Sequence, residues 1–180
     1  MTQPAYNELN VKITPKGDKF MTIKVGDKMP DLTIKQATAN GPMDLVTSEF
    51  FKNKTVVLFA IPGAFTPVCS AKHLPGFITH CEEIMDKGVD QIACLSVNDP
   101  FVLQAWAENQ KVEDSIQMLA DGNGDFTKAM GLGMDLTALG LGYRSQRYAI
   151  VVRNGILKHL DVEPASSCSV TSAEHILEIL

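Results

Sequence analysis

One short stretch limits the fold of this chain more than any other: an apolar run followed at once by a helix start. Residues 55–61 read TVVLFAI, a β-branched and aromatic run that predicts a buried strand. Thr66-Pro67 then predicts a helix N-terminus, because a hydroxyl residue before a proline is typical of that position. Apolar residues recur every three or four positions after it. We therefore expect a strand, a short turn and a helix over about 67–87.

Cys69 falls in the first turn of this predicted helix, beyond the C-terminal end of the strand. Unpaired backbone N–H groups and the positive end of the helix dipole gather at such a position, and both favour a thiolate. A free cysteine is only roughly 3% thiolate at pH 7. A helix terminus contributes about 0.3–1 kcal/mol, which is too little to ionise a thiol fully. A thiolate nucleophile here therefore needs a permanent cation nearby.

The three arginines of the chain are Arg144, Arg147 and Arg153. Arg147 and Arg153 bracket a predicted strand and lie roughly 20 Å apart at the usual rise per residue. If that strand runs antiparallel to the strand at 55–61, its first residue lies beside Cys69. We therefore expect Arg147 to supply the cation, and Arg144 in the preceding loop to assist it.

The remaining patterns give an alternation of strands and helices. Two short runs between residues 31 and 46 flank turn residues at 39–42 and predict an N-terminal β-hairpin. Further along we expect a strand at 91–97, a helix that begins at Asp99-Pro100, a short apolar segment at 116–120 and a brief helix around 125–131. After these we expect a loop over 131–142, strands at 147–153 and 156–162, and a last helix that begins with a capping box at 171–174. This order predicts an α/β fold with a mixed central sheet flanked by helices. We expect one domain over residues 21–180 and an N-terminal extension over 1–20.

Composition excludes several classes of function. The net charge of −5 argues against nucleic acid as a partner. No apolar run approaches the ~20 residues needed to span a bilayer, so no membrane association is expected. Residues 1–20 resemble neither a secretory signal nor a transit peptide, which favours a cytoplasmic protein. The four cysteines lack C-x-x-C spacing and the four histidines form no metal motif. We therefore expect no metal and no other cofactor.

Residues 62–77 read PGAFTPVCSAKHLPGF, and this stretch resembles the signature of the type II, peroxiredoxin-5-like peroxiredoxins. The runs ACLSVND at 93–99 and RYAIVV at 147–152 agree with that family, so the resemblance covers about residues 22–180. It implies a thioredoxin-like fold and an antioxidant oxidoreductase that reduces hydrogen peroxide and organic hydroperoxides. It also implies a homodimer, recycled by thioredoxin or by glutathione with glutaredoxin.

The resemblance makes Cys69 the peroxidatic nucleophile, oxidised to a sulfenic acid, and it selects Arg147 as the arginine beside it. Thr66 offers a hydroxyl that can donate to a thiolate or accept from a peroxide O–H. The expected substrate-binding residues are Pro62, Gly63, Phe65 and Val68. Backbone N–H groups near Val68 and Cys69 can hold the negative charge that develops on oxygen.

The resolving thiol stays open at this point, between Cys168, Cys94 and an external thiol such as glutathione. His73 lies one helical turn after Cys69, and a packing or hydrogen-bonding role is preferred for it. Cys81 falls on the apolar stripe of its helix and is expected in the core. A second hypothesis makes the protein a redox sensor or binding module, in which oxidation of Cys69 changes a partner surface.

Overall fold

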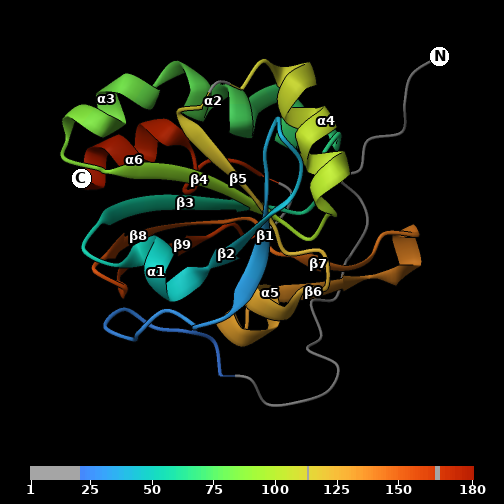
Figure 1. Ribbon diagram of the computed structural model, residues 1–180, viewed down its shortest axis with the longest axis horizontal. Helices are drawn as coiled ribbons and strands as arrows, with labels where there is room; N and C mark the ends of the chain where they lie inside the picture. Colours follow the sequence, from blue (N-terminus) through green and yellow to red (C-terminus); the bar gives the residue numbers. More distant parts are fainter. Residues whose placement is uncertain (1–20, 113, 165–166) are drawn as a thin grey trace.

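The computed structural model describes residues 21–112, 114–164 and 167–180. The extension predicted for residues 1–20 lies outside the described residues. The described part is an α/β fold of three layers, in which helices cover both faces of one sheet (Figure 1). This is the thioredoxin-like architecture expected from the sequence, with a mixed sheet flanked by helices. None of the described helices is both long and apolar enough to cross a membrane.

The central sheet has seven strands in the order β2-β1-β5-β4-β3-β8-β9. Their bounds are β1 Thr33–Ala37, β2 Met43–Val46, β3 Thr55–Ile61, β4 Gln91–Ser96, β5 Ile116–Ala120, β8 Tyr148–Arg153 and β9 Ile156–Val162. β3 pairs in parallel with β4 and β4 with β5, whereas the other pairs are antiparallel. The predicted hairpin at 31–46 is therefore confirmed as β1 and β2.

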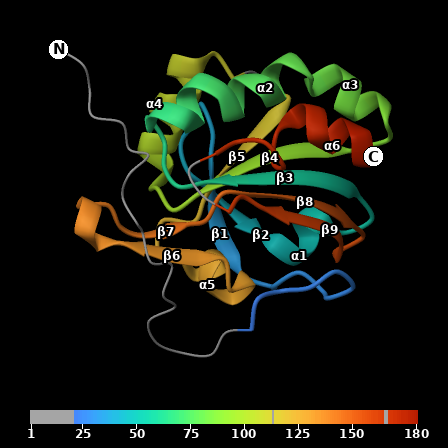
Figure 2. The same cartoon turned by 180° about the vertical axis from the view of Figure 1, so that it is seen from behind.

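Helices lie on both faces of the sheet (Figures 1 and 2). One face is covered by α2 (Leu74–Thr79), α3 (Cys81–Asp86), α4 (Pro100–Gln110) and α6 (Ala173–Ile179). The other face is covered by α1 (Thr47–Phe51), which the sequence analysis did not predict, and α5 (Asp125–Met130). Because side chains along β3 alternate between the two faces of the sheet, they contribute to two separate core clusters. Val57 and Phe59 face α2, whereas Val56 and Leu58 face α1 and α5.

The antiparallel pairing of β3 with β8 confirms the geometric argument about the arginines. Thr55 pairs with Arg153 and Ala60 pairs with Tyr148. Arg147 directly precedes Tyr148, so it lies at the end of the sheet from which the chain runs to Cys69. Arg153 lies at the opposite end of the same strand.

The helix predicted over 67–87 begins at Pro67, as expected, but it is not one regular helix. A π-helical turn, η2 (Cys69–His73), precedes α2, and the chain bends at His80 before α3. Pro75 gives the physical reason for the π turn. It has no N–H to donate, and its ring would clash with the carbonyl four residues earlier in a regular helix.

Two other expectations are corrected. Residues 131–142 were expected to be a loop, but they hold β6 (Gly133–Leu136) and the 3-10 turn η3 (Thr137–Leu139), and β6 pairs with β7 (Gly142–Ser145). The pairing depends on Gly133, because a side chain there would overlap the Tyr143 ring. The last helix is capped by Ser172 and not by Thr171, since Ser172 Oγ accepts from the His175 N–H.

Asp99 caps α4 as the sequence predicts, and its loss should weaken the fold measurably. Its carboxylate accepts hydrogen bonds from the N–H groups of Phe101 and Val102 at 2.9 and 3.0 Å. We expect Asp99→Ala to lower the free energy of unfolding by about 1 kcal/mol in urea denaturation. The exposed Asp31→Ala should change it by less than about 0.5 kcal/mol. Equal effects of the two substitutions would contradict the capping role.

Candidate active site

Cys69 lies at the start of η2, just beyond the C-terminal end of β3, and its side chain is fully buried. The N–H of Ser70 makes a helical hydrogen bond to the carbonyl of Thr66 at 3.0 Å. The N–H groups of Val68 and Cys69 come before that bond, at the helix N-terminus. This position combines a buried thiol with backbone donors, as the sequence predicts.

Arg147 reaches this thiol from the neighbouring strand. Its Nη2 lies 3.4 Å from Cys69 Sγ, although the two residues are 78 positions apart in the sequence. The guanidinium is buried, with Arg147 only 6% exposed. Arg153 is exposed at the far end of β8. The structure therefore brings together the cysteine and the arginine that the sequence analysis selected.

The Arg147 guanidinium makes no direct ion pair within the described part of the chain. Among the described residues, no Asp or Glu lies within ion-pairing distance of its guanidinium, and its Nε has no hydrogen-bond partner. A buried charge without a counter-charge is costly. An anion beside the guanidinium would offset this cost, so the position suits a reaction in which negative charge develops next to Cys69.

His73 holds the other side of the guanidinium. Arg147 Nη1 donates to His73 Nδ1 at 2.9 Å, and His73 Nε2 lies 2.8 Å from the carbonyl oxygen of Thr171. Because guanidinium groups only donate, Nδ1 must accept, and Nε2 carries the proton and donates to Thr171. Burial, together with the charge of Arg147, lowers the pKa of His73 to about 3, so the ring is neutral at pH 7. His73 thus has the hydrogen-bonding role that the sequence analysis preferred.

The loop of residues 62–66 connects β3 to the helical segment that begins at Pro67 and carries Cys69. Thr66 Oγ1 donates to the carbonyl of Gly63 at 2.7 Å, which leaves its lone pairs free to accept. Gly63 is buried, and a Cβ there would lie 3.2 Å from Arg144 Nη1. Phe65 is 54% exposed and has a φ of 60°, a backbone conformation that non-glycine residues rarely adopt. Pro62 and Val68 are partly buried in the same stretch.

Two further side chains lie next to this loop, and one of them, Asn98, hydrogen-bonds to it. Arg144 lies in β7, not in a loop, and donates to the carbonyls of Leu141 and Val97 at 2.8 and 3.1 Å. Asn98 Oδ1 accepts from the Ala64 N–H at 3.0 Å. The sequence analysis did not select Asn98, although its position directly after a strand that ends beside the active site is a usable signal.

Comparisons with known proteins agree with this geometry. A family model described as Redoxin matches residues 24–177. The chloroplastic peroxiredoxin-2E of Arabidopsis thaliana is 45% identical, over 88% of this chain and 70% of the relative. The hybrid peroxiredoxin hyPrx5 of Haemophilus influenzae is 40% identical, over 89% of this chain and 67% of the relative. The chain belongs to the peroxiredoxin family.

A solved structure extends the match to three dimensions. Reduced Prx3 in complex with hydrogen peroxide from Vibrio vulnificus is 48% identical, with a TM-score of 0.84. The alignment covers 88% of this chain and 99% of that one. These relatives are of the type II, peroxiredoxin-5-like kind that the signature at 62–77 indicated. The chain is accordingly a peroxidase of the oxidoreductase class.

In this peroxiredoxin, Glu163 anchors the segment that follows β9. Its carboxylate accepts hydrogen bonds from Ser167 Oγ, from the N–H and hydroxyl groups of Ser169, and from those of Thr171. Burial opposes ionisation, but these hydrogen bonds outweigh it and lower the pKa of Glu163 to about 2. The N–H of Glu163 also donates to the carbonyl of Arg147 at 2.9 Å. Glu163, Thr171, His73 and Arg147 therefore form a closed ring of contacts.

Replacing Glu163 should loosen this ring. In Glu163→Gln, the neutral amide keeps one acceptor oxygen but replaces the other with an NH₂ that cannot accept, so the charge-assisted hydrogen bonds to the carboxylate are weakened or lost. We expect the free energy of unfolding at pH 7 to fall by about 1–3 kcal/mol, measured by urea denaturation. Glu49→Gln is the control, because that carboxylate is exposed beside Lys52, and it should cost less than about 0.5 kcal/mol. An unchanged stability of Glu163→Gln would show that the ring contributes nothing.

The two candidate resolving cysteines differ in their surroundings. Cys94 is fully buried in the middle of β4, and burial, followed by the proximity of Cys69, raises its pKa well above the usual value. Cys168 is half-buried in the segment after β9. Burial raises the pKa of Cys168, whereas the charge of Arg147 opposes this shift. Cys81 is buried in the core, as expected, and all four thiols are free.

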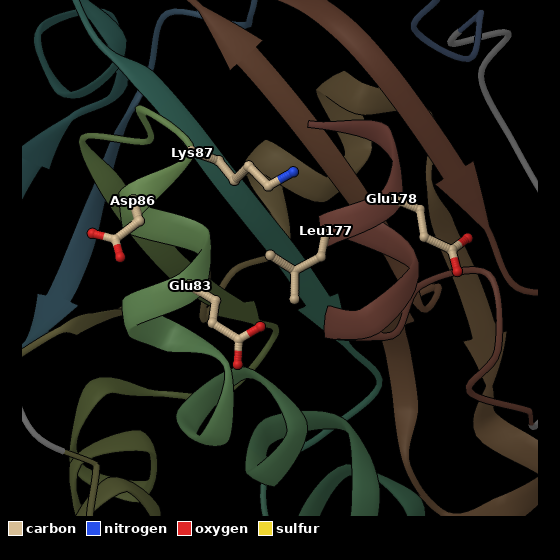
Figure 3. A pocket seen from close by; sticks show the side chains of 5 residues that line it. All are labelled: Glu83, Asp86, Lys87, Leu177 and Glu178. Atoms are coloured by element: carbon tan, nitrogen blue, oxygen red, sulfur yellow. The ribbon is translucent and has the colours of Figure 1, made fainter.

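Cys168 also opens onto a pocket beside the helix that carries Cys69. The pocket has a volume of about 410 Å³ and is lined by Ala71, Lys72, Pro75, Gly76, Thr79, His80, Cys168, Ser172 and Glu174. A different pocket of about 530 Å³ lies between α3 and α6 (Figure 3). It is lined by Glu83, Asp86, Lys87, Leu177 and Glu178, so it offers no thiol. Only the first of these two pockets has a thiol at its wall.

The contrast between the two cysteines gives a direct prediction. In the native protein, iodoacetamide should modify Cys168 and leave Cys94 unmodified, because a buried protonated thiol is a poor nucleophile. Peptide mass spectrometry after a timed reaction measures both. In denaturant, both cysteines should react at similar rates. Native labelling of Cys94 as fast as Cys168 would contradict the burial described above.

Proposed function

We propose that this peroxiredoxin reduces hydrogen peroxide and organic hydroperoxides at Cys69. The Cys69 thiolate attacks the distal peroxide oxygen, the O–O bond breaks, and water or an alcohol leaves after taking up one proton. Cys69 becomes a sulfenic acid. The observation that carries this proposal is the buried guanidinium of Arg147, which lies 3.4 Å from Cys69 Sγ and forms no direct ion pair with a described residue.

The surroundings of Cys69 suit a peroxide. Because the Thr66 hydroxyl already donates to Gly63, its lone pairs can accept the peroxide O–H. The Arg147 guanidinium and the N–H groups of Val68 and Cys69 can stabilise charge on the leaving oxygen. The related Prx3 of Vibrio vulnificus, 48% identical, is described in complex with hydrogen peroxide, which supports a peroxide as substrate here.

We further propose that Cys168 resolves the sulfenic acid. Its thiol attacks the sulfur of Cys69, a disulfide forms, and water is released. A dithiol reductant such as thioredoxin then returns both thiols. The half-exposed Cys168, in a segment outside regular secondary structure, favours this role over Cys94 in the centre of the sheet. The alternatives are resolution by Cys94 and resolution by an external thiol, glutathione with glutaredoxin.

Peroxide consumption tests the central proposal. With a thioredoxin system or with glutathione and glutaredoxin, the wild type should turn over hydrogen peroxide, and Cys69→Ser should not. The buried Cys94→Ala variant should keep the wild-type rate. A Cys69→Ser protein that consumes peroxide at the wild-type rate would overturn the proposal. Rapid oxidation of Cys69 without turnover in either system would favour the redox-sensor hypothesis instead.

Intact mass after one equivalent of hydrogen peroxide tests the resolving role separately. The wild type and Cys94→Ala should each lose two hydrogen atoms, because a disulfide forms. Cys168→Ser should instead gain one oxygen on Cys69. Loss of two hydrogen atoms in Cys168→Ser would exclude Cys168 as the resolving residue.

We also propose a homodimer that uses the exposed apolar side chains around the active site. Phe65, Phe101 and Tyr143 are 54%, 70% and 39% exposed, in the loop before Cys69, the first turn of α4 and β7. Light scattering should give a dimer for the wild type and a monomer for Phe101→Asp. The control Met43→Asp, on the edge strand β2, should remain a dimer.

The predicted cytoplasmic location is tested by cell fractionation.

A further inference from the structure

The edge strand β9 and the last helix α6 bring three potential metal ligands together. His159 and Asp161 are two residues apart on β9, so their side chains project from the same face. His175 on α6 reaches the same carboxylate oxygen. The Asp161 Oδ2 atom lies 2.5 Å from His159 Nε2 and 3.0 Å from His175 Nε2. One potential ligand atom of each residue lies within 4.8 Å of the others.

We propose that the His159–Asp161–His175 cluster binds a divalent transition-metal ion, with zinc as the reference ion. Two imidazole nitrogens and one carboxylate oxygen are ligands that such ions prefer. Bonds to zinc are about 2.0–2.2 Å long, so two ligands of a tetrahedral ion lie roughly 3.4 Å apart. The separations in this structure run from 2.5 Å to at most 4.8 Å. Small side-chain rotations therefore make room for the ion.

The surroundings of His175 support this assignment. A metal-bound Nε2 offers its lone pair, so the ring proton must be on Nδ1. His175 Nδ1 lies 3.7 Å from Glu178 Oε2, which is the kind of carboxylate partner that metal-bound imidazoles usually have. The side chains of His159, Asp161 and His175 are 34%, 24% and 32% exposed. An ion can therefore reach them without opening the core, and solvent can complete its coordination.

The position of the cluster gives the ion a structural role. β9 and α6 are the two elements that flank the segment with Cys168. An ion shared by Asp161 and His175 would tie the two ends of this segment together. The ion would therefore stabilise the C-terminal part of the fold without touching Cys69 or Arg147.

Zinc titration of the full-length, reduced and chelator-treated protein tests the proposal. Calorimetry should show one equivalent bound per chain, and the thermal midpoint should rise with zinc. His159→Gln and His175→Gln should each weaken binding at least tenfold and remove most of the rise in midpoint. His80→Gln is the matched control, since this surface histidine also lies beside carboxylates, and it should bind as the wild type does.

Thiols also bind zinc, so a second measurement distinguishes binding at the histidine–aspartate cluster from binding at a cysteine. With cobalt(II) as the probe, the cluster should give an absorption spectrum without a thiolate charge-transfer band, and Cys168→Ser should leave the affinity unchanged. Circular dichroism and the peroxide rate should match the wild type in both histidine variants. The absence of saturable binding, or binding lost in Cys168→Ser but kept in His175→Gln, would overturn the proposal.

Discussion

Arg147→Gln should reduce the second-order rate of Cys69 oxidation by hydrogen peroxide by about 10²–10³-fold at pH 7. Glutamine can still donate a hydrogen bond, but it carries no charge and is too short to bridge Cys69 and His73. The loss corresponds to about 2.7–4 kcal/mol, the usual effect of removing one preorganised donor from a developing oxyanion. Stopped-flow measurement with a single peroxide equivalent isolates this step from the recycling of the enzyme.

Arg153→Gln provides the matched control for this experiment. Arg153 lies away from Cys69, because it pairs with Thr55 at the far end of β8. Its substitution should leave the rate unchanged. Arg147→Lys should fall between the wild type and Arg147→Gln, because an ammonium keeps the charge but loses the planar fork that contacts two partners. A rate for Arg147→Gln within threefold of the wild type would refute the role of the guanidinium.

The second large effect concerns acid stability and rests on His73. Its pKa is lowered to about 3 in the folded protein, against about 6.5 when unfolded. Between these values the unfolded chain binds a proton that the folded protein does not bind. The stabilising contribution is therefore complete above pH 6.5 and is lost as the pH falls towards 3. From pH 7 to pH 5 the loss is about 2 kcal/mol, at about 1.36 kcal/mol per pH unit below 6.5.

His73→Gln separates this titration from the hydrogen bonds. The glutamine oxygen can accept from Arg147 and its NH₂ can donate to the Thr171 carbonyl, but the side chain does not titrate. We therefore expect the free energy of unfolding of the variant to fall less steeply than that of the wild type between pH 7 and pH 5. The difference in slope should total about 2 kcal/mol. Urea denaturation at several pH values measures it.

His80→Gln is the control for the acid experiment, because His80 is a surface residue at the end of α2. It should keep most of the pH dependence of the wild type. Parallel stability curves for the wild type and His73→Gln would mean that the buried imidazole does not oppose protonation in the folded state.

Much of the active site was predictable because its signals are local. The strand at 55–61, the helix start at Thr66-Pro67 and the position of Cys69 follow from short patterns. Arg147 followed from one topological assumption, the antiparallel pairing of two strands, which the register of β3 with β8 confirms. Each of these steps needed only periodicity or the direction of a strand.

The supporting contacts were not predictable, because they depend on the folded arrangement. His73 and Thr171 are 98 positions apart, and no periodic pattern connects them. Glu163 looks like an ordinary surface acid in the sequence, yet the structure buries it among donors. The error over residues 131–142 has a similar origin. Glycines usually indicate a loop, but here Gly133 makes room for Tyr143 and the chain forms a hairpin.

The distance along the chain between Cys69 and its partners has a consequence for protein synthesis. A ribosome adds roughly 5–20 residues per second, so the 78 positions that separate Cys69 from Arg147 take about 4–16 seconds to translate. During that interval Cys69 has no guanidinium beside it. On the mechanism proposed above, peroxide reactivity at Cys69 therefore requires that β8 has been made and has paired with β3.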